Sequence, residues 1–222
     1  MNATGDAPIS GAGLRSGALA GRFSFVRGLS LSDYLTLTNG IGGAGAVLAV
    51  LGYMANGQVA WLAVAIALYP LCLVMDFLDG RVARARGKSS ALGADLDSLA
   101  DVVSFGVAPA AIGFAAGLRG GWDVFPLLFL VACAIGRLAR YNVTSSALAD
   151  ESGKVRYFEG IPVTGSLIVV AVLAASALTG HLGARLPLGA HRLGPLVFHP
   201  FSLAYLAVGC GMVSKRLHIP KP

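Results

Sequence analysis

Six long apolar stretches constrain the fold of this chain more than any other feature of its sequence. Each is about 20 residues long, which suits a helix that crosses a hydrocarbon core of about 30 Å. They lie near residues 35–54, 59–80, 95–117, 122–142, 161–182 and 194–213. The sequence therefore predicts an all-α, polytopic membrane protein with six transmembrane helices.

Composition supports contact with lipid. Only 13% of the residues are charged, whereas a soluble domain usually carries about 25%, and the mean hydropathy is +0.72. The formal charge of +6 does not indicate a nucleic-acid partner, because no basic stripe is interleaved with exposed aromatic residues. Cys72, Cys133 and Cys210 lie apart in apolar stretches without a CxxC pair, so neither a disulfide framework nor a zinc site is expected.

The distribution of basic residues predicts the orientation. Of the 17 Lys and Arg residues, 14 lie before the first stretch, between the second and third, between the fourth and fifth, or after the sixth. Basic loops remain on the cytoplasmic side, so both termini are expected in the cytoplasm, with the protein in the cytoplasmic membrane. Residues 1–28 are expected to form a flexible cytoplasmic tail, residues 29–222 the six-helix membrane domain, and the polar segment 145–159 a loop.

Four aspartates interrupt the second and third stretches. Asp76 and Asp79 are three residues apart, and Asp97 and Asp101 are four apart, so each pair shares a helix face. A short basic turn joins the two helices, which therefore run antiparallel. All four carboxylates can then converge near the cytoplasmic ends of these helices. Asp95 is out of phase with the third-stretch pair and is interpreted as an ordinary helix-end or ion-paired residue.

Such a cluster requires a cationic partner. One carboxylate within a membrane span costs about 3 kcal/mol on insertion scales, and the nearby arginines lie at the helix end. Hard divalent cations suit clustered carboxylates, and paired cations suit phosphoryl transfer. We therefore predict two Mg²⁺ or Mn²⁺ ions per site, held by Asp76, Asp79, Asp97 and Asp101.

Residues beside the aspartates fit a phosphorylated ligand. The small side chains at Gly80 and Ala83 leave room for a ligand to approach the backbone. Arg84 and Lys88 are positioned to contact phosphate, the arginine through a bidentate fork and the lysine as a point charge.

This stretch resembles the signature of the CDP-alcohol phosphotransferases, D-x2-D-G-x2-A-R-x8-G-x3-D-x3-D. Its fixed positions are filled by Asp76, Asp79, Gly80, Ala83, Arg84, Gly93, Asp97 and Asp101. The resemblance implies a homodimeric membrane enzyme that transfers a phosphoalkyl group from a CDP-linked donor to an alcohol and releases CMP. It also implies that the first three aspartates bind metal and that Asp101, beside the metals, is the catalytic base. The residues expected to bind the donor are Asp76, Gly80, Ala83, Arg84, Lys88 and Asn39.

Further segments resemble the phosphatidylserine synthase branch of this family. They are residues 97–109, 136–142 and 158–162, together with Asn39 and the threonine before it. This narrower resemblance implies CDP-diacylglycerol as donor and L-serine as acceptor. Serine carries a carboxylate and an ammonium group, and the candidates to bind it are Arg137, Arg140, Asn142 and Ser104.

Alternative interpretations of these residues remain open. Arg137 and Arg140 could be basic anchors at the cytoplasmic face, and Ser104 could bond to its own helix. Glu159 could meet the ammonium group or be a solvated loop charge. The acceptor could instead be glycerol 3-phosphate, inositol phosphate or choline, and an unrelated class, a divalent-cation transporter, could also use the aspartates. The four histidines lie away from the aspartates and are assigned no chemistry.

Overall fold

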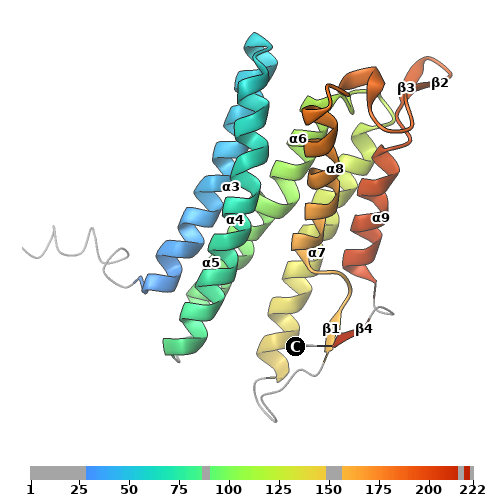
Figure 1. Ribbon diagram of the computed structural model, residues 1–222. Helices are drawn as coiled ribbons and strands as arrows, with labels where there is room; N and C mark the ends of the chain where they lie inside the picture. The colour runs from blue at the N-terminus through green and yellow to red at the C-terminus, as the bar shows by residue number, and fades with distance from the viewer. Residues whose placement is uncertain (1–28, 87–90, 149–156, 215–217, 221–222) are drawn as a thin grey trace, which may run out of the picture.

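The computed structural model describes residues 29–86, 91–148, 157–214 and 218–220, and it shows a bundle of helices (Figure 1). The helices are α3 (Leu31–Asn56), α4 (Val59–Arg86), α5 (Ala91–Asp101), the π-helix η1 (Val102–Val107), α6 (Ala108–Ala116), α7 (Val124–Leu148), α8 (Leu167–Leu178) and α9 (Ser202–Val213). Two 3₁₀ turns, η2 (Val163–Ser166) and η3 (Gly183–Arg185), flank α8. The predicted tail, residues 1–28, lies outside the described residues.

Four of these helical segments are long and apolar enough to cross a membrane. They are α3, α4, the continuous segment Leu92–Ala116 and α7. Two further apolar helices are shorter, Val163–Leu178 and Ser202–Val213. Each of the six predicted stretches therefore contains a helix, and the fold is mainly α-helical as expected.

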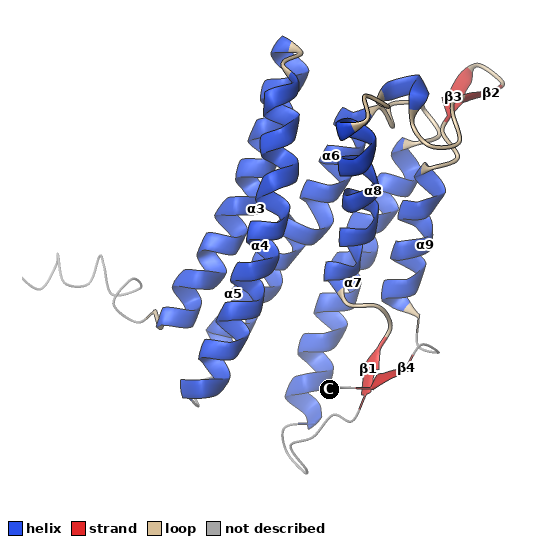
Figure 2. Cartoon of the chain, viewed as in Figure 1, coloured by secondary structure: helices blue, strands red, loops and turns tan. Residues whose placement is uncertain are grey.

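Small sheets correct the all-α prediction. Strand β1 (Tyr157–Glu159) pairs with β4 (His218–Pro220), and β2 (His191–Leu193) pairs with β3 (Leu196–Phe198), both antiparallel (Figure 2).

The prediction that the sixth helix starts near residue 194 is wrong, because Gly194 adopts a φ of 65° in the β2–β3 turn and the helix begins only at Ser202. The predicted loop 145–159 is likewise shortened, since α7 continues to Leu148 and β1 occupies its last residues.

Helix α3 has strong local signals at both ends. The Ser30 hydroxyl accepts from the Asp33 amide at 3.3 Å, and the Asp33 carboxylate accepts from the Ser30 amide at 2.7 Å, forming a capping box. At the other end Gly57 adopts a φ of 69° and its amide donates to the Tyr53 carbonyl at 2.8 Å. Glycine tolerates this left-handed conformation without steric cost, so the chain can reverse into α4.

The bundle buries small side chains and exposes large apolar ones. On α3, Ala46 and Ala49 are 1% and 3% exposed, whereas Ile41 and Leu48 are 70% and 66% exposed. In water each exposed large side chain would forgo about 1.5–3 kcal/mol of burial energy. This arrangement is the one expected of helices that pack closely on one face and contact lipid on the other.

A buried pair joins two loops at the end of the bundle that carries the β2–β3 hairpin (Figure 1). Asp123, before α7, accepts from the backbone amide of His199 at 2.7 Å and lies 2.6 Å from its Nδ1 atom. Both residues are at most 5% exposed. His199 therefore holds the connection into α9 in place, far from the aspartates of α4 and α5.

A second buried contact ties three elements together in the middle of the bundle. The Ser166 hydroxyl donates to the Phe105 carbonyl of η1 at 2.7 Å and lies 2.7 Å from the Tyr69 hydroxyl of α4. The rings of Tyr69 and Phe105 meet edge to face, with their centroids 5.6 Å apart. Because the Ser166 proton is directed to the carbonyl, Tyr69 acts as the donor to Ser166.

Replacing Ser166 by alanine should destabilise the protein by about 1–3 kcal/mol, because the buried Tyr69 hydroxyl and Phe105 carbonyl would both lose this partner. Thermal unfolding of the purified protein in detergent measures the effect. Thr38→Val is a matched control, since the Thr38 hydroxyl is exposed and bonds only its own helix at the Tyr34 carbonyl. Equal midpoints for Ser166→Ala and the wild type would show that this contact is not stabilising.

Candidate active site

Three carboxylates converge between α4 and α5. One oxygen from each of Asp76, Asp97 and Asp101 lies within 4.8 Å of the others. Asp101 is 6% exposed, and the Oδ1 atom of Asp97 is buried without a hydrogen-bond partner among the described residues. The predicted convergence of the two helical pairs is confirmed for these three side chains.

Asp79 faces α3 instead of this trio. It is 4% exposed, and its Oδ2 atom accepts from the Thr36 hydroxyl at 2.8 Å. The two residues belong to neighbouring antiparallel helices, and the bond fixes the Asp79 carboxylate at the edge of the cluster. Its role as a metal ligand stays a prediction.

Asn39 contacts the trio from α3. Its Nδ2 atom donates to Oδ1 of Asp101 at 3.0 Å, and the residue is fully buried. Sequence reasoning named Asn39 as a donor-binding residue but did not identify this contact. A usable signal was present, because Ser32, Thr36, Asn39 and Gly43 recur at helical spacing in an otherwise apolar helix.

Ser104 is also directed to α3. Its hydroxyl donates to the Asn39 carbonyl at 2.9 Å, and the residue is 1% exposed. The expectation that this hydroxyl could bond its own helix is therefore replaced by a contact between helices. Its predicted role in binding serine is not tested by this geometry.

The backbone changes its winding immediately after Asp101. Residues Val102–Val107 form a π-helix, and the Ala108 amide donates to the Val103 carbonyl five residues earlier. π-Helical turns are rare and occur frequently at functional sites. Here the Phe105 carbonyl accepts from Ser166, so the irregular turn is held from outside the helix.

A cavity of about 310 Å³ opens beside the carboxylates. Asp76, Asp97 and Asp101 line this cavity, and so does Arg137 of α7. Arg137 is 9% exposed, and its Nε atom has no hydrogen-bond partner among the described residues. The remaining lining residues are Ala94, Ser98, Leu138, Tyr141, Asn142 and Pro162, Val163 and Thr164. The arrangement suits a ligand with one end near carboxylates and an anionic group near arginine.

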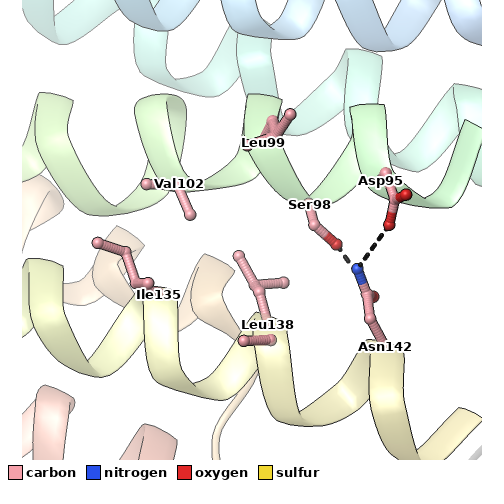
Figure 3. Close-up of a pocket in the computed structure, with 8 residues that line it drawn as sticks. Asp95, Ser98, Leu99, Val102, Ile135, Leu138 and Asn142 are labelled. Carbon is pink, nitrogen blue, oxygen red and sulfur yellow. Dashed lines mark hydrogen bonds between the residues drawn. The ribbon is translucent and has the colours of Figure 1, made fainter. Parts of the chain in front are cut away.

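A second cavity of about 370 Å³ lies between α5, η1 and α7 (Figure 3). Its polar end is formed by Asn142, which accepts from Ser98 at 3.1 Å and donates to Asp95 at 3.4 Å. Asp95 thus links α5 to α7 through Asn142 and does not belong to the carboxylate trio. This agrees with its position in the sequence, which is out of phase with Asp97 and Asp101 on the helix. Asn142 lines both cavities, so its predicted role in serine binding is compatible with its position.

Other predicted residues lie outside the lining of the first cavity. Arg84 is exposed, and its guanidinium lies over Gly80, where an added Cβ would meet Nη1 at 3.5 Å. Arg140 donates to the Val213 carbonyl of α9 at 3.4 Å. Lys88 lies outside the described residues. Donor contacts by Gly80, Ala83, Arg84 and Lys88 therefore stay predictions.

The donor set fits a hard divalent cation. All three clustered ligands are carboxylates, as Mg²⁺ and Mn²⁺ prefer. The unpartnered Oδ1 atom of Asp97 needs a positive partner in this buried position. Arg137 supplies one positive charge to a cavity lined by three carboxylates, so the charge of the site is compatible with a divalent cation.

Comparisons with known proteins identify the family. The family model described as CDP-alcohol phosphatidyltransferase matches residues 29–206. A Saccharomyces cerevisiae protein named CDP-diacylglycerol–serine O-phosphatidyltransferase is 44% identical over 203 residues, which cover 90% of this chain and 74% of that protein. A Mycobacterium leprae protein of the same name is 44% identical over 118 residues, covering 50% of this chain and 37% of the relative.

A solved structure shares the fold. The crystal structure of Mycobacterium tuberculosis phosphatidylinositol phosphate synthase with CDP-DAG bound aligns with a TM-score of 0.50 at 20% identity, covering 88% of this chain and 86% of that one. The family model spans α3 to α8, the first residues of α9 and the whole carboxylate cluster. The chain therefore belongs to the CDP-alcohol phosphatidyltransferase family.

Proposed function

We propose that this protein is a CDP-diacylglycerol–serine O-phosphatidyltransferase, which transfers a phosphatidyl group to the hydroxyl of L-serine and releases CMP. The observation that carries this proposal is the cavity in which three carboxylates face a buried arginine. The names of the yeast and mycobacterial relatives support the same reaction.

The charge of the cavity favours serine over a phosphorylated acceptor. Among the described residues that line it, Arg137 is the only basic side chain. Serine brings a single carboxylate, which one guanidinium can bind through two parallel hydrogen bonds. Glycerol 3-phosphate or inositol phosphate brings a more highly charged group and would need additional cations.

We infer that the chain crosses the cytoplasmic membrane six times, with both termini and the active site facing the cytoplasm. The positive-inside distribution of Lys and Arg supports this topology. So does the arrangement of the bundle, because the start of α3, the end of α4 and the β1–β4 sheet lie at one end (Figure 1). The homodimer implied by the sequence resemblance stays a prediction.

The aspartates would hold the metal ions. Mg²⁺ or Mn²⁺ ions, two per site, would neutralise the charge of the donor pyrophosphate when bound. Their proposed ligands are Asp76, Asp79, Asp97 and Asp101. The Thr36 hydroxyl of α3 holds the Asp79 carboxylate at the edge of this cluster.

The proposed reaction exchanges one bond to phosphorus for another. Asp101 accepts the proton of the serine hydroxyl, and the serine oxygen forms a bond to the phosphorus that carries the diacylglycerol. The bond from that phosphorus to the CMP oxygen breaks, and CMP leaves with the electron pair. Arg137 holds the serine carboxylate, which places the hydroxyl near Asp101 across the cavity. Positioning and charge compensation are the protein's main contributions.

The donor would bind along α4, with its cytidine near Gly80 and Ala83 and its acyl chains extending into lipid. Apolar residues that face outward from α4, Val74 at 51% and Phe77 at 55% exposure, support this path. Arg84 and Lys88 would contact the phosphates.

Release of CMP from CDP-diacylglycerol should require L-serine far more than glycerol 3-phosphate, inositol phosphate or choline. The reason is that Arg137, the single arginine among the described residues that line the cavity, can bind the one carboxylate of serine. Purified protein is incubated with the donor and each alcohol, and CMP is quantified. Equal or faster turnover with a phosphorylated alcohol would refute the serine assignment while leaving the family membership intact.

Chelation by EDTA should abolish CMP release, and Mg²⁺ or Mn²⁺ should restore it. The same cations should raise the thermal midpoint, because a ligand that binds only the folded state stabilises it. Asp97→Asn should reduce this midpoint shift, whereas Asp95→Asn, two residues away and outside the trio, should retain it. Full activity after exhaustive chelation would contradict the metal requirement.

Arg137→Gln should raise the KM for L-serine by about 10–100-fold, because a charge-assisted hydrogen bond contributes about 1.5–3 kcal/mol. The KM for CDP-diacylglycerol should change little. L-Serinamide, which lacks the carboxylate, tests the contact directly. The wild type should strongly prefer L-serine over L-serinamide, whereas Arg137→Gln should use the two at similar rates.

Arg140→Gln is the matched comparison, since Arg140 lies outside the cavity lining and contacts α9. It should retain most of the preference for serine over serinamide. If Arg140→Gln loses this preference and Arg137→Gln keeps it, the assignment of the carboxylate site is wrong.

A further inference from the structure

Helix α3 presents a buried polar residue to the carboxylate cluster, although it contributes none of the aspartates. We propose that Asn39 is a positioning residue that holds one oxygen of Asp101, so that the other oxygen faces the acceptor hydroxyl. This inference rests on the proposed role of Asp101 as the base in the transfer reaction.

The contact between the two side chains is direct and shielded. The Nδ2 atom of Asn39 donates to Oδ1 of Asp101 at 3.0 Å. Asn39 is 0% exposed and Asp101 is 6% exposed. Asp101 lines the cavity, whereas Asn39 is absent from its lining. Asn39 therefore does not line the cavity itself. It can influence a ligand there only through its hydrogen bond to Asp101.

The backbone of Asn39 is held as firmly as its side chain. Its carbonyl accepts from the Ser104 hydroxyl at 2.9 Å and from the Cys72 thiol at 3.5 Å. These two donors come from η1 and α4, and both reach the same carbonyl. The amide group of Asn39 thus projects from a backbone that two neighbouring elements fix.

Two glycines allow α3 to approach close enough for this contact. A Cβ at Gly43 would lie 2.5 Å from the Ser104 hydroxyl and 2.7 Å from the Ser104 Cα atom. A Cβ at Gly40 would lie 3.3 Å from that of Ala100, the residue before Asp101. These close approaches bring the α3 backbone near the chain on both sides of Asp101, within reach of the Asn39 side chain.

The chemistry of an amide suits this position. A carboxamide donates to a carboxylate without adding a charge, and it holds that carboxylate in one rotamer. An aspartate at residue 39 would repel Asp101, and a glutamine would be one methylene too long for the fixed separation. Residues that orient a functional carboxylate typically affect activity or metal affinity by about 10–100-fold.

The test separates positioning of Asp101 from binding of the donor. Asn39→Leu removes the amide while keeping a similar size, and Thr38→Val changes the adjacent exposed residue as a control. Turnover, the KM for each substrate, and CDP-diacylglycerol affinity in the presence of Mn²⁺ without serine are measured for each protein. Asn39→Leu should lower kcat by about 10–100-fold, with donor affinity within about threefold of the wild type; Thr38→Val should leave both unchanged.

A double-mutant cycle with Asp101→Asn provides an independent readout. If Asn39 acts through Asp101, Asn39→Leu should cause no further loss of the single-turnover rate in the Asp101→Asn background. Multiplicative losses in the double variant, or a large loss of donor affinity in Asn39→Leu, would overturn the proposal and favour a direct role in donor binding.

Folding and the choice of acceptor are controlled separately. Thermal unfolding and size exclusion in detergent identify variants that do not fold, and Asn39→Ser, which also removes the amide but is smaller, replaces Asn39→Leu if the latter fails. If the wild type releases CMP with another alcohol and not with serine, the proposed function is wrong. The double-mutant cycle of Asn39→Leu and Asp101→Asn is then measured with that alcohol as the acceptor. Retention of full turnover by the folded Asn39 variant overturns the positioning role with either acceptor.

Discussion

The structure depends on a cluster of carboxylates placed between apolar helices. Asp76, Asp97 and Asp101 lie within a few ångströms of one another, in surroundings where an isolated charge costs several kcal/mol. The neighbouring protein groups offset part of this cost: Asn39 donates to Asp101, and Arg137 supplies positive charge across the cavity. The buried Oδ1 atom of Asp97 has no hydrogen-bond partner among the described residues, so these protein groups do not satisfy the cluster completely. A site of this kind is poised for a ligand that brings positive charge with it.

Close helix packing follows from the same requirement. Donors on α3 can reach the carboxylates only if the helices approach closely, and Gly43 permits this where it meets Ser104. The π-helical turn after Asp101 then redirects the chain, and Ser166 satisfies the carbonyl of Phe105 within that turn. The polar contacts and the small residues are therefore parts of one arrangement, in which α3 supports the face of α5 that carries Asp101.

The sequence was sufficient to predict the helices and the core of the site, because both depend on local periodicity. Spacings of three and four residues placed Asp76, Asp97 and Asp101 on facing helix surfaces, and the short connection made the helices antiparallel. The helical spacing of Thr36 and Asn39 indicates that they share a face of α3, but it does not indicate which atoms of α4 and α5 they contact. The β2–β3 hairpin was missed because its apolar strand β3 reads as the start of a membrane helix, and only the backbone of Gly194 reveals the turn.

The arrangement of the cavity separates the chemistry from the choice of acceptor. The fixed positions of the family signature lie on α4 and α5, and in the proposed reaction the carboxylates there act on the phosphate groups of the CDP-linked donor. The opposite wall comes from α7 and the segment at residues 162–164, which carry Arg137 and Asn142 but none of the signature positions. In the proposed reaction, a change of acceptor alters the charge and shape required of this second wall while leaving the first unchanged. Under this proposal, a phosphorylated acceptor would require additional positive charge at the wall formed by α7, where Arg137 is the only basic side chain among the described lining residues.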